Sequence, residues 1–311
     1  MKIFNSIQEF STTSKTIVTL GTFDGVHKGH KSILEKLINS SKSTGYESVV
    51  LTFFPHPRMV LQQNTDIKLL NTINEKAFLL DQYGIDNLII HPFDHAFSRL
   101  TAEEFVKDIL VSKLNISKII IGHDHRFGRN RTATIDDLIV FGKEYGFEVE
   151  QISALEINEV SVSSTKIRNA LNEGLLETAN KFLGYPYFIT GTVIKGKQLG
   201  RTIGFRTANI SIAEDYKLIP ANGVYVASSI IDNKKVFGMM NIGNNPTVGG
   251  TTQSIEVNFF DFDEDIYDQE IRVNIHYRIR DEIKFPSLDA LKNQLAEDQK
   301  TSLEYINSKQ L

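Results

Sequence analysis

The chain has 311 residues, enough for two domains of about 150 residues each, and its 41% hydrophobic and 23% charged content is typical of folded globular proteins rather than disordered or fibrous ones. Its 34 basic and 38 acidic residues give a net charge of −4, which argues against a strongly basic surface for nucleic acid. It contains no cysteine, which excludes disulfides, thiol nucleophiles and cysteine zinc sites.

The first 184 residues alternate between short β-branched apolar runs and longer stretches with helical spacing. The expected strands lie at 16–20, 48–54, 87–90, 118–121 and 147–152, and the expected helices at 30–38, 74–82, 102–114 and 135–145. This alternation predicts an α/β domain, a doubly wound parallel sheet with helices on both faces. Ligands of such sheets bind beyond the carboxyl ends of the strands, so the loops that follow strands should carry the site.

After residue 184 the pattern changes to short alternating runs separated by turn residues. These runs lie at 188–194, 224–230, 236–242, 254–260 and 271–277. They predict a small antiparallel β-barrel or sandwich, of which we favour the barrel, and the apolar spacing over 287–306 predicts a terminal helix packed on it. We therefore expect one domain at 1–184 and a second at 185–311.

No apolar run approaches the ~18–20 residues of a membrane-spanning helix. The N-terminal segment MKIFNSIQEFSTTSK lacks the apolar stretch of a signal peptide. Together with the absence of cysteine, these features predict a soluble, cytoplasmic protein that binds neither membranes nor nucleic acid. They do not predict an oligomeric state.

The first expected strand runs into a glycine-rich segment with two histidines, LGTFDGVHKGH at 20–30. Glycines let the backbone approach a ligand closely, and a helix that begins here directs free N–H groups at an anion. His27 and His30 add two donors that can hold the oxygens of a reacting phosphate. The alternative is a turn with two solvent-exposed histidines. We favour a polyphosphate site because both histidines flank a glycine at a strand-to-helix junction.

This segment resembles the H-x-G-H signature of the nucleotidylyltransferase superfamily. Residues 163–168, SSTKIR, resemble the second motif of that superfamily, although a serine-capped surface helix is the alternative. Residues 54–57, FPHP, and 122–128, GHDHRFG, resemble segments of the adenylyltransferase half of the bifunctional bacterial riboflavin kinase/FAD synthetase family. That family usually has phenylalanine where His125 stands.

The resemblance implies a Rossmann-like nucleotidylyltransferase domain with three sets of site residues. The implied catalytic residues are His27, His30 and Arg168. The implied nucleotide-binding residues are Gly21, Phe23, Asp24, Gly25, Gly29, Ser163, Ser164 and Thr165. The implied flavin-binding residues are Phe54, His56, Pro57, Asp124, Arg126 and Phe127.

In the C-terminal half, residues 191–209, GTVIKGKQLGRTIGFRTAN, resemble the opening of the riboflavin kinase domain, with Arg206 where that family usually has proline. The resemblance implies that Gly196, Gly200 and Gly204 bind nucleotide. It also implies that Thr207 and Asn209 bind Mg²⁺ with ATP. A hydroxyl and an amide oxygen are hard ligands of the kind that Mg²⁺ prefers.

Three further segments resemble the kinase domain: 223–225 (GVY), 241–247 (NIGNNPT) and 255–262 (IEVNFFDF). Within the last of these, the resemblance makes Glu256 the general base, while Asn258 stands where histidine is common. The alternative for Glu256 is a solvent-facing glutamate on a strand.

Together the resemblances cover nearly the whole chain and imply an enzyme with two activities. The C-terminal domain would phosphorylate riboflavin to FMN with MgATP, and the N-terminal domain would join FMN to AMP from a second ATP, giving FAD and pyrophosphate. Flavins are then substrates and products. Two alternatives stay open: another adenylyl- or cytidylyltransferase with an unrelated C-terminal domain, or a flavin-binding regulator whose kinase half has decayed.

Overall fold

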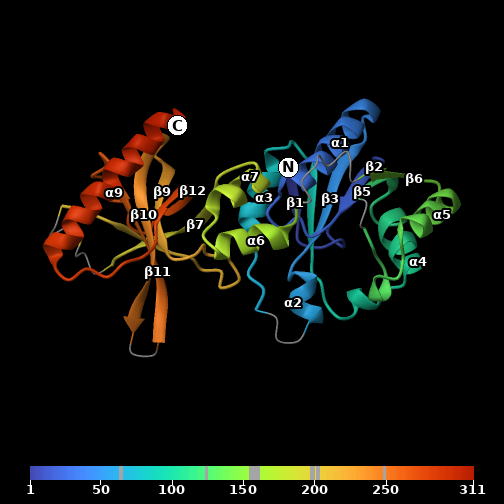
Figure 1. Ribbon diagram of the computed structural model, residues 1–311. Coiled ribbons are helices and arrows are strands. Elements are labelled where there is room, and N and C mark those ends of the chain that lie inside the picture. Colours follow the sequence, from blue (N-terminus) through green and yellow to red (C-terminus); the bar gives the residue numbers. More distant parts are fainter. Residues whose placement is uncertain (63–65, 123–124, 154–161, 197–199, 201–203, 248–249) are drawn as a thin grey trace. The chain divides into compact units, whose positions relative to one another are not determined.

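The computed structural model describes residues 1–62, 66–122, 125–153, 162–196, 200, 204–247 and 250–311 (Figure 1). Internal packing divides the chain into two compact units, residues 1–163 and 164–311. The division falls before the expected boundary at 184, because helices α6 (Ser164–Asn172) and α7 (Leu176–Leu183) pack with the C-terminal unit.

The first unit contains a sheet of six strands in the order β1-β4-β3-β2-β5-β6, and every neighbouring pair is parallel (Figure 1). The strands are β1 (Lys2–Phe4), β2 (Thr16–Leu20), β3 (Glu47–Phe53), β4 (Asn87–His91), β5 (Ile116–Gly122) and β6 (Glu148–Ile152). The chain winds outward from β2 to β4 and then returns to β5, beside β2. The expected doubly wound fold is confirmed, and its winding reverses between β2 and β5, the point at which such sheets bind ligands.

The helices of this unit are α1 (Lys28–Thr44), α2 (Pro57–Leu61), α3 (Ile73–Asp81), α4 (Ala102–Glu104) and α5 (Ile135–Tyr145). Short 3-10 turns lie at Phe97–Arg99 and Arg129–Arg131. The helix expected at 102–114 is divided, because α4 continues as a π-helix over Phe105–Val111.

The central strands are buried on both sides. Val18, Leu51 and Ile119 are each 0% exposed. Strands covered by helices on both faces have continuous apolar sequences rather than alternating ones, which is why they could be recognised from sequence. The edge strand β1 was not expected, because only three residues form it and Ile3 is 51% exposed.

The second unit contains a closed barrel of antiparallel strands in the order β10-β11-β8-β7-β12-β9. The strands are β7 (Tyr187–Ile194), β8 (Ala208–Ser211), β9 (Gly223–Ile231), β10 (Lys234–Thr247), β11 (Gly250–Phe259) and β12 (Glu270–Arg280). The terminal helix α9 (Leu288–Lys309) packs on β9, β10 and β12 (Figure 1). The expected barrel and terminal helix are confirmed, whereas the four-residue β8 was not expected.

Helices α6 and α7 are joined to the barrel by hydrogen bonds. The backbone N–H of Ala221 donates to the carbonyl oxygen of Leu171 at 3.0 Å. Asn180 Nδ2 donates to the carbonyl oxygen of Ile275 at 3.0 Å, and its Oδ1 accepts from the backbone N–H of Tyr187 at 2.7 Å. These bonds make the two helices part of the C-terminal unit.

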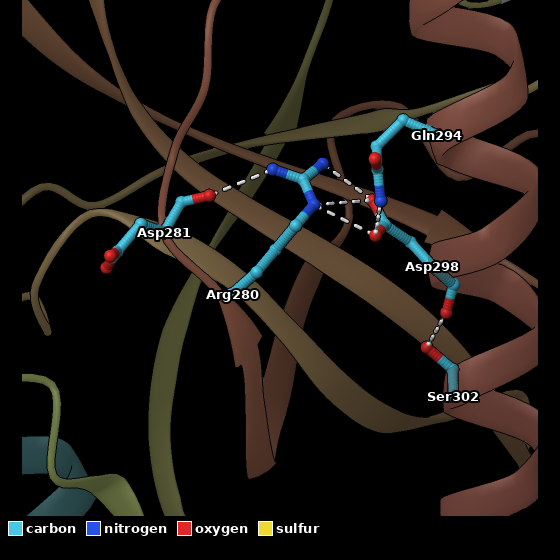
Figure 2. Close-up of polar contacts among 5 residues, drawn as sticks. All are labelled: Arg280, Asp281, Gln294, Asp298 and Ser302. Carbon is cyan, nitrogen blue, oxygen red and sulfur yellow. Dashed lines mark hydrogen bonds and ion pairs between the residues drawn. The ribbon is translucent and has the colours of Figure 1, made fainter.

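A buried ion pair fixes α9 to the barrel (Figure 2). Arg280 on β12 donates from Nε and Nη2 to the carboxylate of Asp298 at 2.9 and 2.6 Å, and Gln294 donates to the same carboxylate at 3.0 Å. Asp298 is 1% exposed. Because a bidentate pair fixes the relative orientation of two planar groups, it sets the position of α9 as well as contributing energy.

Replacing Asp298 with asparagine should weaken the fold strongly. The Asp298→Asn variant keeps the size of the side chain but leaves the charge of Arg280 uncompensated. We expect the free energy of unfolding, measured by urea denaturation, to fall by about 3 kcal/mol, as when one member of a buried pair is removed.

The matched control is Asp281→Asn. The Asp281 carboxylate pairs with Arg278 at 2.6 Å, but its side chain is 81% exposed. An exposed pair contributes less than about 1 kcal/mol. Equal losses in the two variants would contradict the role assigned to the Arg280–Asp298 pair.

Two fragments test where the C-terminal folding unit begins. A fragment of residues 185–311 lacks the three hydrogen bonds described above for α6 and α7, whereas residues 164–311 keep them. At about 1 kcal/mol per hydrogen bond and about 4 °C per kcal/mol, we expect the longer fragment to melt about 10 °C higher by calorimetry. Equal melting temperatures would show that α6 and α7 add no stability to the barrel.

Candidate functional site

The loop between β2 and α1 has a strained backbone that brings two histidine rings together. Phe23 and Val26 have φ of +46° and +36°, in the left-handed region that residues other than glycine rarely adopt. His27 caps α1, since its Nδ1 accepts from the backbone N–H of Gly29 at 3.2 Å. The rings of His27 and His30 stack with their centroids 3.8 Å apart. Both imidazoles therefore lie at a helix N-terminus, where an anion is favoured.

His30 has unused hydrogen-bonding capacity. Burial holds its pKa well below the usual range, and the charges of His27 and Lys76 lower that pKa further, so the ring is neutral at pH 7. Its Nδ1 is buried without a hydrogen-bond partner in the part of the chain that the structure describes. Buried polar atoms are normally paired, so the imidazole is suited to a ligand contact.

Asp24 lies beneath the loop rather than on its surface. It is 1% exposed, and its Oδ1 accepts from the backbone N–H groups of Leu70 at 2.9 Å and Asn71 at 3.4 Å. These bonds tie the loop after β2 to the segment that precedes α3. Asp24 thus supports the loop, and its expected contact with nucleotide stays a prediction.

An aromatic cluster lies near the carboxyl ends of β3 and β4. The ring of Phe53 lies 5.7 Å from that of Phe93 and 5.5 Å from that of Phe97. Phe105 continues the cluster, 6.2 Å from Phe97 and 6.0 Å from Phe127, one of the expected flavin-binding residues. Phe93 and Phe97 were missed from sequence, because they lie in a segment without strand or helix periodicity.

The other expected flavin-binding residues follow β3 and β5. Phe54 is half-buried directly after β3, and His56 caps α2, which Pro57 begins, by accepting from the backbone N–H of Arg58 at 3.1 Å. Arg126 is exposed in the segment after β5. Asp124 lies outside the described residues.

The second adenylyltransferase-like motif occupies the start of α6. Ser163 precedes this helix, Ser164 is its first residue, and Arg168 Nη2 donates to Thr165 Oγ1 at 3.5 Å. Helix α6 belongs to the second compact unit, whereas the histidines belong to the first. Joint action of the two motifs stays a prediction.

The second candidate site lies on β8 and β11 of the barrel. Glu256 is the register partner of Asn209, and Thr207 Oγ1 donates to Glu256 Oε2 at 3.3 Å. Ile255 and Val257 are buried, whereas Glu256 between them is half-buried on the opposite face of β11. The structure therefore brings together the three oxygen-bearing side chains expected to serve as base and metal ligands.

Glycines make room for the loop that precedes β8. A Cβ atom on Gly196 would collide with the side chain of Asn209, and one on Gly200 would collide with the carbonyl oxygen of Phe205. Gly204 has φ of +88°, which disfavours other residues. The glycines are thus required by the shape of the loop, and their contacts with nucleotide stay a prediction.

Family models match both halves of the chain. Residues 9–166 match the family model described as FAD synthetase, and residues 183–306 match the model described as riboflavin kinase. A Buchnera aphidicola (subsp. Schizaphis graminum) protein named bifunctional riboflavin kinase/FMN adenylyltransferase is 38% identical over 99% of both chains. The chain belongs to the bifunctional riboflavin kinase/FMN adenylyltransferase family.

A second relative and a solved structure are similar to nearly the whole chain. The Escherichia coli K12 protein of the same name is 35% identical over 98% of both chains. A crystal structure from Streptococcus pneumoniae, described as a macrolide-efflux protein, has 33% identity and a TM-score of 0.88 over 97% of this chain and 98% of its own.

No helix in the described part of this chain is long and apolar enough to cross a membrane.

The two departures from the riboflavin kinase pattern, Arg206 and Asn258, contact each other. Asn258 Nδ2 donates to the carbonyl oxygen of Arg206 at 2.7 Å. The Arg206 side chain in turn donates to the carbonyl oxygen and carboxylate of Asp263 at 2.9 and 3.1 Å. Proline would restrain the backbone at position 206 through its ring. Here a hydrogen bond from β11 restrains the same loop.

The kinase-like site offers oxygen ligands that suit magnesium, and a pocket lies beside Thr207. Thr207, Asn209 and Glu256 offer hard oxygens, and Mg²⁺ usually takes only one or two protein ligands besides phosphates and water. Among the described residues, no group of three or more histidine, aspartate or glutamate side chains could hold a metal ion. The apolar side chains lining the pocket beside Thr207 include Val193, Val257, Phe259, Phe262, Ile266 and Tyr267.

Two buried polar residues beside the first site were missed from sequence. Lys76 is 3% exposed and Asn71 is 1% exposed, with neither amide atom of Asn71 hydrogen-bonded within the described residues. A signal for Lys76 existed, because its spacing from Ile73, Ala77 and Leu80 places it on the apolar stripe of α3. Nothing in the sequence marks Asn71.

Removing the hydrogen bond from Asn258 should loosen the loop before β8. In Asn258→Ala, we expect amide hydrogen exchange of the peptide 204–209 to accelerate about fivefold, the effect of losing about 1 kcal/mol. Mass spectrometry after deuterium labelling measures this rate. The control is Asp263→Ala, which removes only an exposed ion pair and should change exchange little. Unchanged exchange in Asn258→Ala would contradict the restraint.

Proposed function

We propose that this chain is a bifunctional enzyme that phosphorylates riboflavin to FMN on the barrel and adenylylates FMN to FAD in the α/β unit. The observation that carries the proposal is the cluster of Glu256, Thr207 and Asn209, joined by strand register and a 3.3 Å hydrogen bond. The stacked histidines at the start of α1 support the second activity.

On the barrel, Glu256 takes the proton of the terminal ribityl hydroxyl as that oxygen attacks the γ-phosphate of ATP, and ADP leaves. Thr207 and Asn209 would hold Mg²⁺, which neutralises charge on the phosphates when bound. The pocket beside Thr207 is lined by apolar side chains together with Arg206, Glu264 and Asp265, and we assign it to part of the nucleotide. Phosphoryl transfer depends mainly on positioning and charge neutralisation, both of which these side chains supply.

In the α/β unit, a phosphate oxygen of FMN attacks the α-phosphorus of ATP, and the bond to the leaving pyrophosphate breaks. This phosphate is largely ionised at pH 7 and needs no strong base. His27 and His30 donate to the phosphate oxygens, where negative charge develops. Arg168 adds positive charge, and the hydroxyls at 163–165 add donors to the nucleotide.

The flavin ring requires an apolar, aromatic surface. Phe93 and Phe97 are half-buried and offer one where they pack on the buried ring of Phe53. Offset stacking and edge contacts with a planar ring are favourable in such clusters. We assign the flavin of the adenylyl-transfer reaction to this surface, with Phe127 at its far end.

The structure favours neither alternative from the sequence. An unrelated C-terminal domain disagrees with the riboflavin kinase match over residues 183–306. A decayed kinase half disagrees with the intact contact between Thr207 and Glu256. Arg206 and Asn258, the reasons for suspecting decay, instead form a hydrogen bond that restrains the loop.

Two variants should separate the activities. Glu256→Gln keeps size and hydrogen bonding but removes the base, so riboflavin phosphorylation should fall ~10²–10⁴-fold while supplied FMN is still adenylylated. His30→Ala should give the reverse, with FMN accumulating and FAD absent. The protein is incubated with riboflavin or FMN, ATP and magnesium, and the flavins are separated by chromatography.

Thermal unfolding of each variant controls for damage to the fold, because damage confined to one compact unit would lower only the activity of that unit. Loss of both reactions in either variant, in protein whose thermal unfolding is unchanged, would mean that one site serves both. Riboflavin left unchanged by the unaltered protein would overturn the proposed kinase activity itself.

A further inference from the structure

A buried lysine lies behind the loop that carries the two histidines. Lys76, in α3, is 3% exposed, and its Nζ donates to the carbonyl oxygen of Thr22 at 2.7 Å. A longer contact of 3.5 Å joins the same Nζ to Thr52 Oγ1 on β3. Lysine is almost never fully buried without a charge partner or a hydrogen-bonding task. Here the lysine forms its hydrogen bond with the loop, at the carbonyl oxygen of Thr22.

The carboxylate that opposes the positive charge of Lys76 lies on the same loop. Asp24 is also buried, two residues after Thr22, and its negative charge acts on Lys76. Between Thr22 and Asp24 in the chain lies Phe23, with φ of +46°. A left-handed residue with a bulky side chain persists only where its surroundings hold it in place. The hydrogen bond from Lys76 fixes Thr22, on one side of this strained residue. The bonds from the backbone N–H groups of Leu70 and Asn71 fix Asp24, on the other side.

We propose that Lys76 is a positioning residue for adenylyl transfer: its buried ammonium, opposite Asp24, holds the strained loop in the conformation that stacks His27 on His30, and the reaction slows when that charge is lost. The inference rests on the proposed function of the α/β unit. Lys76 acts through the loop and not by contact with the reacting phosphates.

The charged state of Lys76 is sensitive to pH. Burial lowers the pKa of Lys76 to about 8, although the carboxylate of Asp24 acts in the opposite direction. The other titratable groups around it are His27 and His30 on the loop and α1, and Glu75 beside it on α3. Above pH 8 the lysine becomes neutral, and its bond to Thr22 loses the strength of a charge-assisted bond. The buried carboxylate of Asp24 then keeps its bonds from the backbone N–H groups of Leu70 and Asn71 but loses the opposing charge of the lysine, which is costly.

Two variants separate the charge from the bulk of the side chain. Lys76→Met keeps the length and removes the ammonium, so kcat for conversion of FMN to FAD should fall about 10–100-fold through displacement of the histidines. Lys76→Arg keeps the charge and should retain most of this rate. Lys36→Met is the matched control: Lys36 lies on α1 of the same unit, 2.8 Å from Glu150, with 37% of its side chain exposed. It should stay within about twofold of the unaltered protein.

The pH profile gives a readout that a purely structural role would not change. In the unaltered protein, adenylyl transfer should fall as the pH rises through 8. In Lys76→Arg this fall should disappear, because a guanidinium keeps its charge throughout that range. Thermal unfolding of each variant reports whether its α/β unit is folded, because riboflavin phosphorylation takes place on the other compact unit.

A second readout does not depend on activity. The charge of Lys76 lowers the pKa of His30, so NMR titration of the His30 ring should show a higher pKa in Lys76→Met and a low one in Lys76→Arg. This measurement separates failure of the inference from failure of the proposed function, since it requires no substrate. If Lys76→Met does not fold, Lys76→Arg alone decides.

Two outcomes would overturn the inference: adenylyl transfer by folded Lys76→Met within twofold of the unaltered protein, or an unchanged fall above pH 8 in Lys76→Arg. An unaltered protein that makes FMN but no FAD would overturn the proposed adenylyl transfer instead.

Discussion

Parallel pairing of β2 with β3 and β5 is the constraint on which the α/β unit depends. Parallel strands direct all their carboxyl ends to one edge of the sheet, so the loops after Leu20, Phe53 and Gly122 emerge side by side. The reversal of winding between β2 and β5 leaves that edge uncovered by a crossover. The histidine loop and the aromatic cluster follow from this arrangement, because both begin where these strands end.

The barrel uses a different constraint, the two-residue alternation of antiparallel strands. Alternation along β11 buries Ile255 and Val257 and leaves Glu256 on the opposite face, while register with β8 places Asn209 beside it. A shift of one residue in this register would put the carboxylate inside an apolar core. The arrangement of the proposed kinase site is therefore inseparable from the packing that stabilises the barrel.

Sequence predicted the parts of this structure that repeat a local pattern and missed those that depend on distant contacts. The central strands followed from apolar periodicity, whereas Glu256 was indicated by the resemblance to the kinase family. The burial of Asp24 and Lys76 followed from neither, because their partners lie 46 and 54 residues away in the chain. Asn258 and Arg206 are 52 residues apart, so the sequence did not reveal that these two departures from the kinase pattern form a hydrogen bond with each other.

Helix α6 gives the chain two boundaries that do not coincide. The packing boundary lies at 163/164, whereas the motif that resembles an adenylyltransferase extends to Arg168, beyond that boundary. A gene split at the packing boundary would therefore assign this motif to the barrel, and one split at 184 would separate α7 from the strands it covers.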